Sequence, residues 1–307
     1  MNPSLATRNG PHSAGIDAQG VLDSRMLPDP EFDLMWDSIF VDEEIKTRLL
    51  SQGLLNFVLR PALARGAIPL HGIILLVGPP GTGKTTLAKG LASRVAASVS
   101  NMGEFRFIET EPHALAGAAL GKSQKAVREF LGGTVAEAAA SGPLIVLLDE
   151  VETLAADRQK LSLEANPVDV HRASDAVLAQ LDHLASENPN VLFIATSNFP
   201  QAIDEAFLSR ADLRVDVGLP GDEACYAILN DTVAKIAQSF PGLNRLLDGH
   251  QLQEAGAACY GLDGRQIRKA VITAMTFDKR TALNPEQLTA QDIFNAVNMA
   301  RQSKESA

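Results

Sequence analysis

Five short segments rich in apolar residues recur along the chain, as continuous runs or, at Phe105–Glu109, as an alternating pattern, and most are followed by a loop and then by a segment with helical spacing. Runs of this kind are typical of strands in a parallel sheet whose two faces are covered by helices. The runs are Ile73–Val77, Phe105–Glu109, Pro143–Leu148, Val191–Thr196 and Leu213–Val217. Strands that alternate with helices predict an α/β fold, here a mostly parallel five-stranded sheet flanked by helices.

The pattern changes at Gly218-Leu219-Pro220-Gly221, a turn-forming segment that we interpret as a hinge. Beyond it the apolar spacing is helical only, as at about 222–240, 264–277 and 289–303. The N-terminal residues are rich in Pro, Gly, Ser, Asn and Asp without sustained periodicity, which predicts a flexible arm. We therefore divide the chain into an arm at 1–31, a large α/β domain at 32–219 and a small helical lid at 220–307.

Composition excludes several classes of protein. The 307 residues are 46% hydrophobic and 21% charged, as in ordinary globular proteins, and their net charge of -10 argues against a non-specific nucleic-acid surface. Cys225 and Cys259 form no CxxC pair, and the histidines show no paired ligand spacing, so neither a disulfide framework nor a zinc site is indicated. Because no apolar run reaches the roughly 18 residues of a membrane span and no signal peptide is evident, we expect a cytoplasmic protein without a membrane partner.

The turn after Ile73–Val77 carries the clearest chemistry. Gly78, Gly83, Lys84 and Thr85 fit the pattern G-x-x-x-x-G-K-[ST], in which backbone N–H groups enclose phosphates, the lysine reaches the outer phosphates and the hydroxyl ligates Mg²⁺. The helix that begins near Lys84 adds the positive end of its dipole. We expect a nucleoside triphosphate and Mg²⁺ here, with Phe40 and Val41 beside the base and the phosphates held by Gly78, Pro79, Pro80, Gly81, Thr82, Gly83, Lys84, Thr85 and Thr86.

Acidic and amide groups follow two of the other predicted strands. Pro143–Leu148 ends in Asp149 and Glu150, and the next run is followed by Asn198. Asp149 is placed to hold Mg²⁺ through its water shell, and Glu150 to orient or deprotonate the attacking water. Asn198 is expected to hold either the same water or a γ-phosphate oxygen. These groups predict hydrolysis rather than binding alone.

Together these strand-end groups resemble the AAA+ ATPases, which bind ATP and act as rings. The segment AIDEAFLSRAD (202–212) is similar to the one that carries the arginine finger in that superfamily, so Arg210 would reach the neighbouring subunit's nucleotide, with Arg214 as the second candidate. GLDGR (261–265) resembles the sensor-2 position, which implies that Arg265 contacts the γ-phosphate of its own subunit. Arg268, one turn further along, is expected to be solvated.

A narrower resemblance covers the chain from about Trp36 to its end. The segments that carry it are MWDSIFVDEEIKTRLL (35–50), LLDEVETL (147–154), NPVDVHRASDAVLAQLD (166–182), LSRADLR and GLDGR. They look like the thyroid-receptor-interacting-protein-13 / pachytene-checkpoint-2 family, which remodels HORMA-domain proteins. The resemblance implies a homohexamer that draws a segment of a HORMA-domain substrate through its central pore and converts a closed partner to an open one. Short bacterial members are associated with HORMA proteins and nucleotide second-messenger synthases in phage defence.

Two departures from the family pattern affect how substrate is held. Only the weakly patterned arm precedes Trp36, where larger members have a folded domain that docks an adaptor, so direct substrate recognition, or use of the arm itself, is favoured over adaptor docking. The loop that usually offers an aromatic residue to the substrate contains Ala119, Leu120 and Gly121, of which Leu120 is the one large apolar side chain. The segment 158–167 is the candidate for a second pore loop.

Two other function classes stay open at this stage. A nucleic-acid-handling AAA+ protein, such as a clamp loader or helicase loader, is disfavoured by the acidic charge balance and the lack of a basic and aromatic stripe. A nucleotide-dependent scaffold that assembles without mechanical work is supported only by the pore loop's lack of an aromatic residue.

Overall fold

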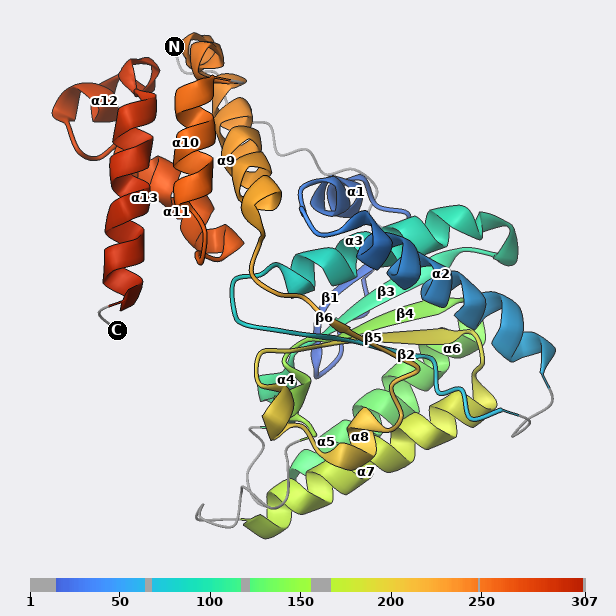
Figure 1. The fold of residues 1–307 in the computed structure, drawn as a ribbon. Coiled ribbons are helices and arrows are strands. Elements are labelled where there is room, and N and C mark those ends of the chain that lie inside the picture. The colour runs from blue at the N-terminus through green and yellow to red at the C-terminus, as the bar shows by residue number, and fades with distance from the viewer. Residues whose placement is uncertain (1–14, 64–67, 117–121, 156–166, 248, 306–307) are drawn as a thin grey trace, which may run out of the picture.

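The computed structural model describes residues 15–63, 68–116, 122–155, 167–247 and 249–305. Its centre is one six-stranded sheet with the strand order β1-β3-β4-β5-β2-β6, seen nearly edge-on in Figure 1. Neighbouring strands are parallel except for β1, which pairs antiparallel with β3. The strands are β1 (Val21–Leu27), β2 (Ile73–Val77), β3 (Phe105–Thr110), β4 (Leu144–Leu148), β5 (Val191–Ser197) and β6 (Leu213–Asp216).

Strand β1 corrects the expectation of five strands. It lies within the segment 1–31 that the sequence pattern predicts to be a flexible arm, and it pairs with β3 from Val21 opposite Thr110 to Leu27 opposite Phe105. The strand is missing from the sequence prediction because it is an edge strand with polar residues at its centre and only one buried position, Leu27. A half-exposed edge strand lacks the continuous apolar run that identifies the inner strands.

Helices cover both faces of the sheet, as predicted. Because side chains alternate along a strand, Ile74 and Leu76 of β2 face a core shared with α1, α2 and α3. Ile73 and Leu75 face a second core shared with α5, α7 and the turn between α5 and α6. The helices are α1 (Pro30–Asp37), α2 (Glu43–Leu59), α3 (Lys84–Ser98), α4 (Pro112–Ala116), α5 (Lys122–Glu129), a π-helical turn (Phe130–Val135), α6 (Ala136–Ser141), α7 (Pro167–Glu187) and α8 (Glu205–Leu208).

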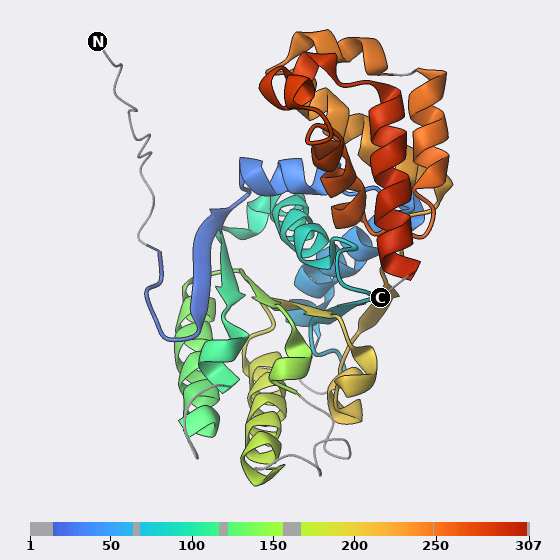
Figure 2. The ribbon, with the colours of Figure 1, turned by 90° about the vertical axis from the view of Figure 1, so that its left-hand side faces the viewer.

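The C-terminal residues form a separate helical layer with its own core (Figure 2). Its helices are α9 (Asp222–Ala237), α10 (His250–Ala258), α11 (Gly264–Ala274), α12 (Lys279–Leu283) and α13 (Ala290–Glu305). Cys225 and Cys259 are both buried in this core, and burial raises the pKa of their thiols to about 11 and about 12. Both cysteines therefore act as small apolar residues rather than as nucleophiles. No helix in the described part of the chain combines the length and apolarity needed to cross a bilayer.

Candidate functional site

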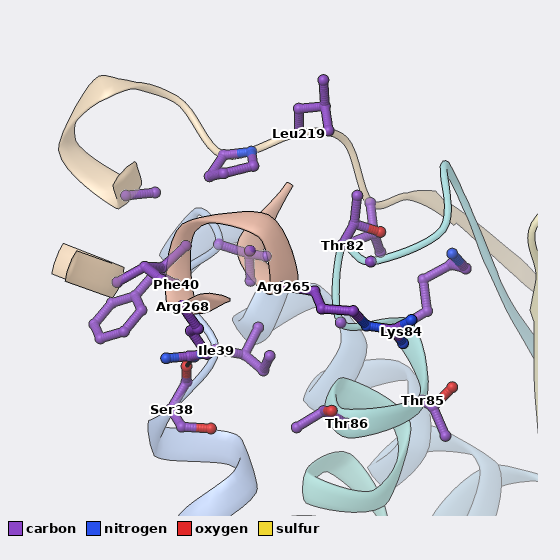
Figure 3. Close-up of a pocket in the computed structure, with 18 of the residues that line it drawn as sticks. Ser38, Ile39, Phe40, Thr82, Lys84, Thr85, Thr86, Leu219, Arg265 and Arg268 are labelled. Atoms are coloured by element: carbon purple, nitrogen blue, oxygen red, sulfur yellow. Dashed lines mark hydrogen bonds between the residues drawn. The ribbon is translucent and has the colours of Figure 1, made fainter. Parts of the chain in front are cut away.

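A cavity of about 1250 Å³ lies between the carboxyl edge of the sheet and the helical lid. Its walls come from places far apart in the sequence, which include the segment after α1, the turn between β2 and α3, the ends of β4, β5 and β6, and the lid helices α9 and α11 (Figure 3). Ligands bind at this edge of open α/β sheets because the strands end there and the following loops are free to vary. The lining residues include Ser38, Phe40, Val41, Pro80, Gly81, Thr82, Gly83, Lys84, Thr85, Thr86, Asp149, Glu150, Asn198, Arg265 and Arg268.

The turn at Gly78–Gly83 has a backbone that only glycine adopts without strain at three positions, Gly78, Gly81 and Gly83. Gly81 has φ +82°, and a Cβ built on it would lie 2.5 Å from the Asp263 side chain. Gly83 has φ +92° and precedes α3 directly, where a Cβ would lie 2.6 Å from Ile39. The first N–H groups of a helix have no partner within the helix, so this start of α3 offers donors to an anion. The turn therefore fits a cradle for phosphate oxygens.

Lys84 supplies a buried positive charge beside this turn. Lys84 is only 5% exposed, and its Nζ donates hydrogen bonds to the carbonyl oxygens of Gly78 at 2.9 Å and Pro79 at 2.8 Å. Burial lowers the pKa of Lys84, and the nearby carboxylates Glu152, Asp149 and Glu150 act in the opposite direction. The ammonium is thus held between the loop and an acidic cluster, at the position where the motif places the outer phosphates.

Asp149, which follows β4, is hydrogen-bonded to side chains on helix α3 and strand β5. Its Oδ1 accepts hydrogen bonds from Thr85 Oγ1 at 2.8 Å and from Thr196 Oγ1. Hydroxyl and carboxylate oxygens are the ligands that Mg²⁺ prefers, so Thr85 and Asp149 are suitable to hold that ion. Thr196 was not predicted from the sequence, although it is a hydroxyl side chain near the end of an otherwise apolar strand, next to the strand that leads to Asp149.

Glu150 has an unusual backbone. At φ +50° it is the one non-glycine residue with a positive φ in the described part of the chain, and its N–H donates to Thr196 Oγ1 at 3.2 Å. Its Oε1 accepts a hydrogen bond from Asn198 Nδ2 at 3.3 Å, and its Oε2 lies 3.8 Å from His113 Nε2. The side chain is 46% exposed, so one carboxylate is oriented by neighbours yet remains open to water. A non-glycine residue in this conformation is a feature of functional sites.

Glu152 is hydrogen-bonded to the backbone of Asn198. Its Oε1 accepts the backbone N–H of Asn198 at 3.1 Å, while Oε2 is buried without a hydrogen-bond partner among the described residues. Glu152 belongs to the LLDEVETL segment that carries the family resemblance, but no role was predicted for it from the sequence. A third acid two positions after Glu150, in the turn that follows a buried strand, was the signal that could have identified it.

The segment after α1 belongs to both halves of the molecule. Phe40 packs on the core of the lid, whereas Val41 packs on the core shared by the sheet and α1–α3. Both residues line the cavity, as the sequence prediction of a base-binding position requires.

Arg265 extends from the start of α11 towards Lys84 (Figure 3), so the structure brings the predicted sensor and the predicted phosphate loop together.

The expectation for Arg268 is wrong. Its guanidinium, far from being solvated, donates hydrogen bonds to Asp231, Thr232 and the carbonyl oxygen of Ser38. The reason is tertiary: Ser38 is separated from Arg268 by 230 positions in the sequence, and the fold places the end of α1 beside α11. Local spacing on a helix cannot reveal such an acceptor.

Arg210 and Arg214 lie away from the cavity, and neither is among its lining residues within the described chain. Arg210 precedes β6, close to Asp212, whose carboxylate accepts backbone N–H groups at the start of β2. Since β6 and β2 are parallel, Arg210 sits at the amino edge of the sheet, opposite the phosphate loop. Arg214 lies within β6, where it is 46% exposed and 3.6 Å from Asp216.

Arg210 is held by a two-point ion pair. Its Nε and Nη2 donate to the two carboxylate oxygens of Asp182 at 2.6 and 2.7 Å, and Nη1 donates to the carbonyl oxygen of Ala206. These hydrogen bonds raise the pKa of Arg210 and lower that of Asp182. Arg210 is thus held in one orientation by hydrogen bonds to α7 and α8 of its own chain.

The predicted pore loop at Ala119, Leu120 and Gly121 lies outside the described residues, as does most of the segment 158–167. The structure places the ends of the helices that flank them: α4 ends at Ala116, and α7 begins at Pro167.

Comparison with known proteins places this site in context. The profile of the ATPase family associated with various cellular activities (AAA) matches residues 74–219. CD-NTase-associated protein 6 of Pseudomonas aeruginosa is 54% identical over 298 residues, which cover 97% of both chains. The pachytene checkpoint protein 2 homolog of Arabidopsis thaliana is 35% identical over 277 residues, or 80% of this chain and 59% of the relative.

Two solved structures share the fold over nearly the whole chain. The structure of C. elegans PCH-2 has a TM-score of 0.73 and 26% identity, covering 96% of this chain and 79% of that one. A chain of the E. coli MS115-1 HORMA:CdnC:Trip13 complex also has a TM-score of 0.73, at 18% identity, covering 92% of this chain and 95% of the other. The second likeness shows the fold alone. The first agrees with the sequence matches to the pachytene checkpoint protein 2 homologs.

Proposed function

Since this chain belongs to the AAA family of ATPases, in the group of pachytene checkpoint protein 2 and CD-NTase-associated protein 6, we propose that it hydrolyses ATP to remodel a HORMA-domain protein in a bacterial defence system. The observation that carries the proposal is the joined set Thr85, Asp149, Glu150 and Asn198, connected by hydrogen bonds at one edge of the sheet. A chain with the same fold occurs in a complex titled HORMA:CdnC:Trip13, which supports the partner class.

The residues around the cavity divide the chemistry among themselves. The turn and Lys84 bind the triphosphate, and Arg265 contacts its γ-phosphate from the lid. Thr85 and Asp149 would hold Mg²⁺, which when bound offsets negative charge on the phosphate oxygens. Glu150 and Asn198 orient a water whose oxygen attacks the γ-phosphorus. The water's proton passes to Glu150, and the bond to the β-phosphate oxygen breaks to release ADP and phosphate.

Arg210 acts on the neighbouring subunit's nucleotide in this proposal. The two edges of the sheet are separated by the length of β2, about 17 Å for a five-residue strand, so Arg210 cannot serve the cavity of its own chain. Its two-point pairing with Asp182 favours it over Arg214, whose partner contact is longer and more exposed. A site completed by the next copy implies a closed ring, which we take to be the homohexamer of the family.

Remodelling requires that substrate reach the ring's centre. We assign this contact to the loop at 119–121, which follows α4, with the segment before α7 as a second contact. Drawing a segment of the HORMA-domain partner through the pore would convert it from a closed to an open form. The action is expected in the cytoplasm, where ATP is available.

Substitution Glu150→Gln tests the proposal. The variant should bind ATP and form rings, while its turnover should fall by about a hundredfold or more because the base is lost. Lys84→Ala is the matched control: it should fail in nucleotide binding itself, measured by titration with a fluorescent ATP analogue.

The partner is tested with the same pair of variants. Glu150→Gln in ATP should retain a HORMA-domain protein from its native cell, and Lys84→Ala should not. Undiminished turnover of Glu150→Gln would remove the residue from its role. Retention of nucleic acid in place of a HORMA-domain protein would overturn the remodelling proposal.

A further inference from the structure

Arg268 lies one helical turn beyond Arg265 on α11 and connects two parts of the molecule. Its Nη1 donates to Asp231 Oδ2 at 3.1 Å and to Thr232 Oγ1 at 3.4 Å, both on α9 of the lid. Its Nη2 donates to the carbonyl oxygen of Ser38 at 2.8 Å, in the large domain. The guanidinium therefore connects the lid to the large domain directly, with its side chain only 34% exposed.

The acceptor in the large domain is itself firmly placed. Ser38 caps the carboxyl end of α1, where helix carbonyls lack partners within the helix. Helix α1 lies directly on α3: a Cβ built at Gly90 would come within 2.7 to 2.8 Å of the Trp36 backbone and Cβ. Because α3 begins at Lys84, the position of Ser38 is coupled through close packing to the phosphate-binding turn.

A second contact holds the start of α11. Asp263 caps this helix by accepting the N–H of Gln266 at 2.9 Å, in a reciprocal capping box. The same side chain lies against the phosphate-binding turn, since a Cβ at Gly81 would be 2.5 Å from its Cγ. Helix α11 thus meets the large domain at two points, Asp263 and Arg268, and Arg265 lies between them in the sequence. Two contacts define the direction of a helix axis where one would allow it to pivot.

We infer that Arg268 is a positioning residue that sets the angle of α11 and thereby places Arg265 at the phosphate end of the cavity. Asp231 holds the guanidinium in place and also pairs with Lys235 at 2.7 Å. The inference rests on the proposed contact of Arg265 with the γ-phosphate. It predicts that loss of Arg268 affects ATP, which has a γ-phosphate, more than ADP, which does not.

The test measures how tightly Arg268→Ala, Arg265→Ala and the double variant bind ADP and a non-hydrolysable ATP analogue. Arg268→Ala should weaken ATP binding by about tenfold, the size expected for charge-assisted hydrogen bonds, with ADP changed by less than about twofold. The double variant should lose no more than the larger single loss, because both act through one contact. Equal losses for ATP and ADP, or additive losses, would show a general role in lid packing and overturn the inference.

A matched control separates this effect from damage to the lid. Arg280 is also a lid arginine paired with an aspartate, but its partner Asp278 is local and its side chain is 78% exposed. Arg280→Ala should leave both affinities unchanged. If Arg265→Ala leaves the ratio of the ATP affinity to the ADP affinity unchanged, the proposed role of Arg265 is wrong and the inference is overturned with it. If Arg265→Ala lowers the ratio and Arg268→Ala does not, only the inference is overturned.

A nucleotide-free measurement tests the joint itself. Backbone hydrogen exchange at 38–42 should be faster in Arg268→Ala than in the parent chain, because the Ser38 carbonyl loses its contact to the lid. Arg280→Ala should exchange at the parent rate in this segment. Unchanged exchange in Arg268→Ala would show that the hydrogen bond to Ser38 does not hold the two parts together.

Discussion

The two edges of the sheet differ in how complete they are within one chain. At the carboxyl edge, Asp149 and Glu150 find hydrogen-bond partners on α3 and β5, and the lid covers the site. At the amino edge, Arg210 is held by Asp182 alone among carboxylates, and no phosphate-binding turn lies beside it in the described chain. The carboxyl edge thus gathers a nucleotide site within one chain, whereas Arg210 at the amino edge has a target only if, as we propose, it acts on the nucleotide of another copy. The predictions below test that difference.

The largest effect is expected from Arg210→Ala. Loss of an arginine that stabilises transferring phosphate reduces turnover by about a thousandfold in related chemistry, and nucleotide binding should be kept. Mixing this variant with Lys84→Ala, which keeps its arginine but lacks a working site, should restore hydrolysis. In an equal mixture about a quarter of the parent activity is expected. Half of the nucleotide sites, those of the Arg210→Ala chains, keep Lys84, and half of these have a Lys84→Ala neighbour that supplies Arg210.

The mixing experiment can break the comparison between the edges. If the mixture stays inactive while both variants form mixed rings, shown by co-purification of differently tagged chains, then Arg210 does not act across subunits. Arg214→Ala is the matched control, because Arg214 lies in β6, the strand that Arg210 precedes. This variant should keep most of the parent turnover.

A smaller effect is expected from Glu152, which supports the carboxyl edge without facing the water. Glu152→Gln keeps an oxygen that can accept the Asn198 N–H, so it should lower turnover only a few-fold. Glu152→Ala removes the acceptor and should lower turnover by about tenfold, with the KM for ATP changed less than kcat. Equal effects of the two substitutions would show that the hydrogen bond to Asn198 is not the relevant contact.

These effects bear on how much the sequence alone could predict. The strands β2 to β6, the phosphate-binding turn and the acids at the end of β4 were recognisable because apolar or alternating runs and glycine spacing are local signals. Strand β1 was not, because an edge strand with polar residues at its centre depends on β3 for its pairing. Thr196 and Arg268 were missed for a related reason: their roles come from partners 47 and 230 positions away.

The smallest effect concerns the ion pair at the amino edge. The pKa of Asp182 is lowered in the folded chain by its hydrogen bonds to Arg210. A carboxylate with a lowered folded-state pKa adds stability above its unfolded-state pKa, about 3.9, and this stability is lost as the pH falls through the folded-state value. The Asp182 side chain is 45% exposed, so solvent screening limits its contribution to below about 1 kcal/mol.

The corresponding measurement compares thermal unfolding of the parent and Asp182→Asn between pH 7 and the acid limit of the folded state. The difference in Tm should be small at neutral pH and should disappear as the pH falls below about 4. A difference that grows on acidification would contradict the assigned sign of the shift.

The segment after α1 has a consequence for nucleotide release. Phe40 packs against the core of the lid and Val41 against the core of the sheet, although their Cα atoms are only about 3.8 Å apart, the fixed spacing across a trans peptide. A rotation of the lid must therefore be absorbed by the backbone torsions of the residues that line the base end of the cavity. Lid movement and the shape of the base end of the cavity are thereby coupled, so that release of a bound nucleotide would depend on rotation of the lid.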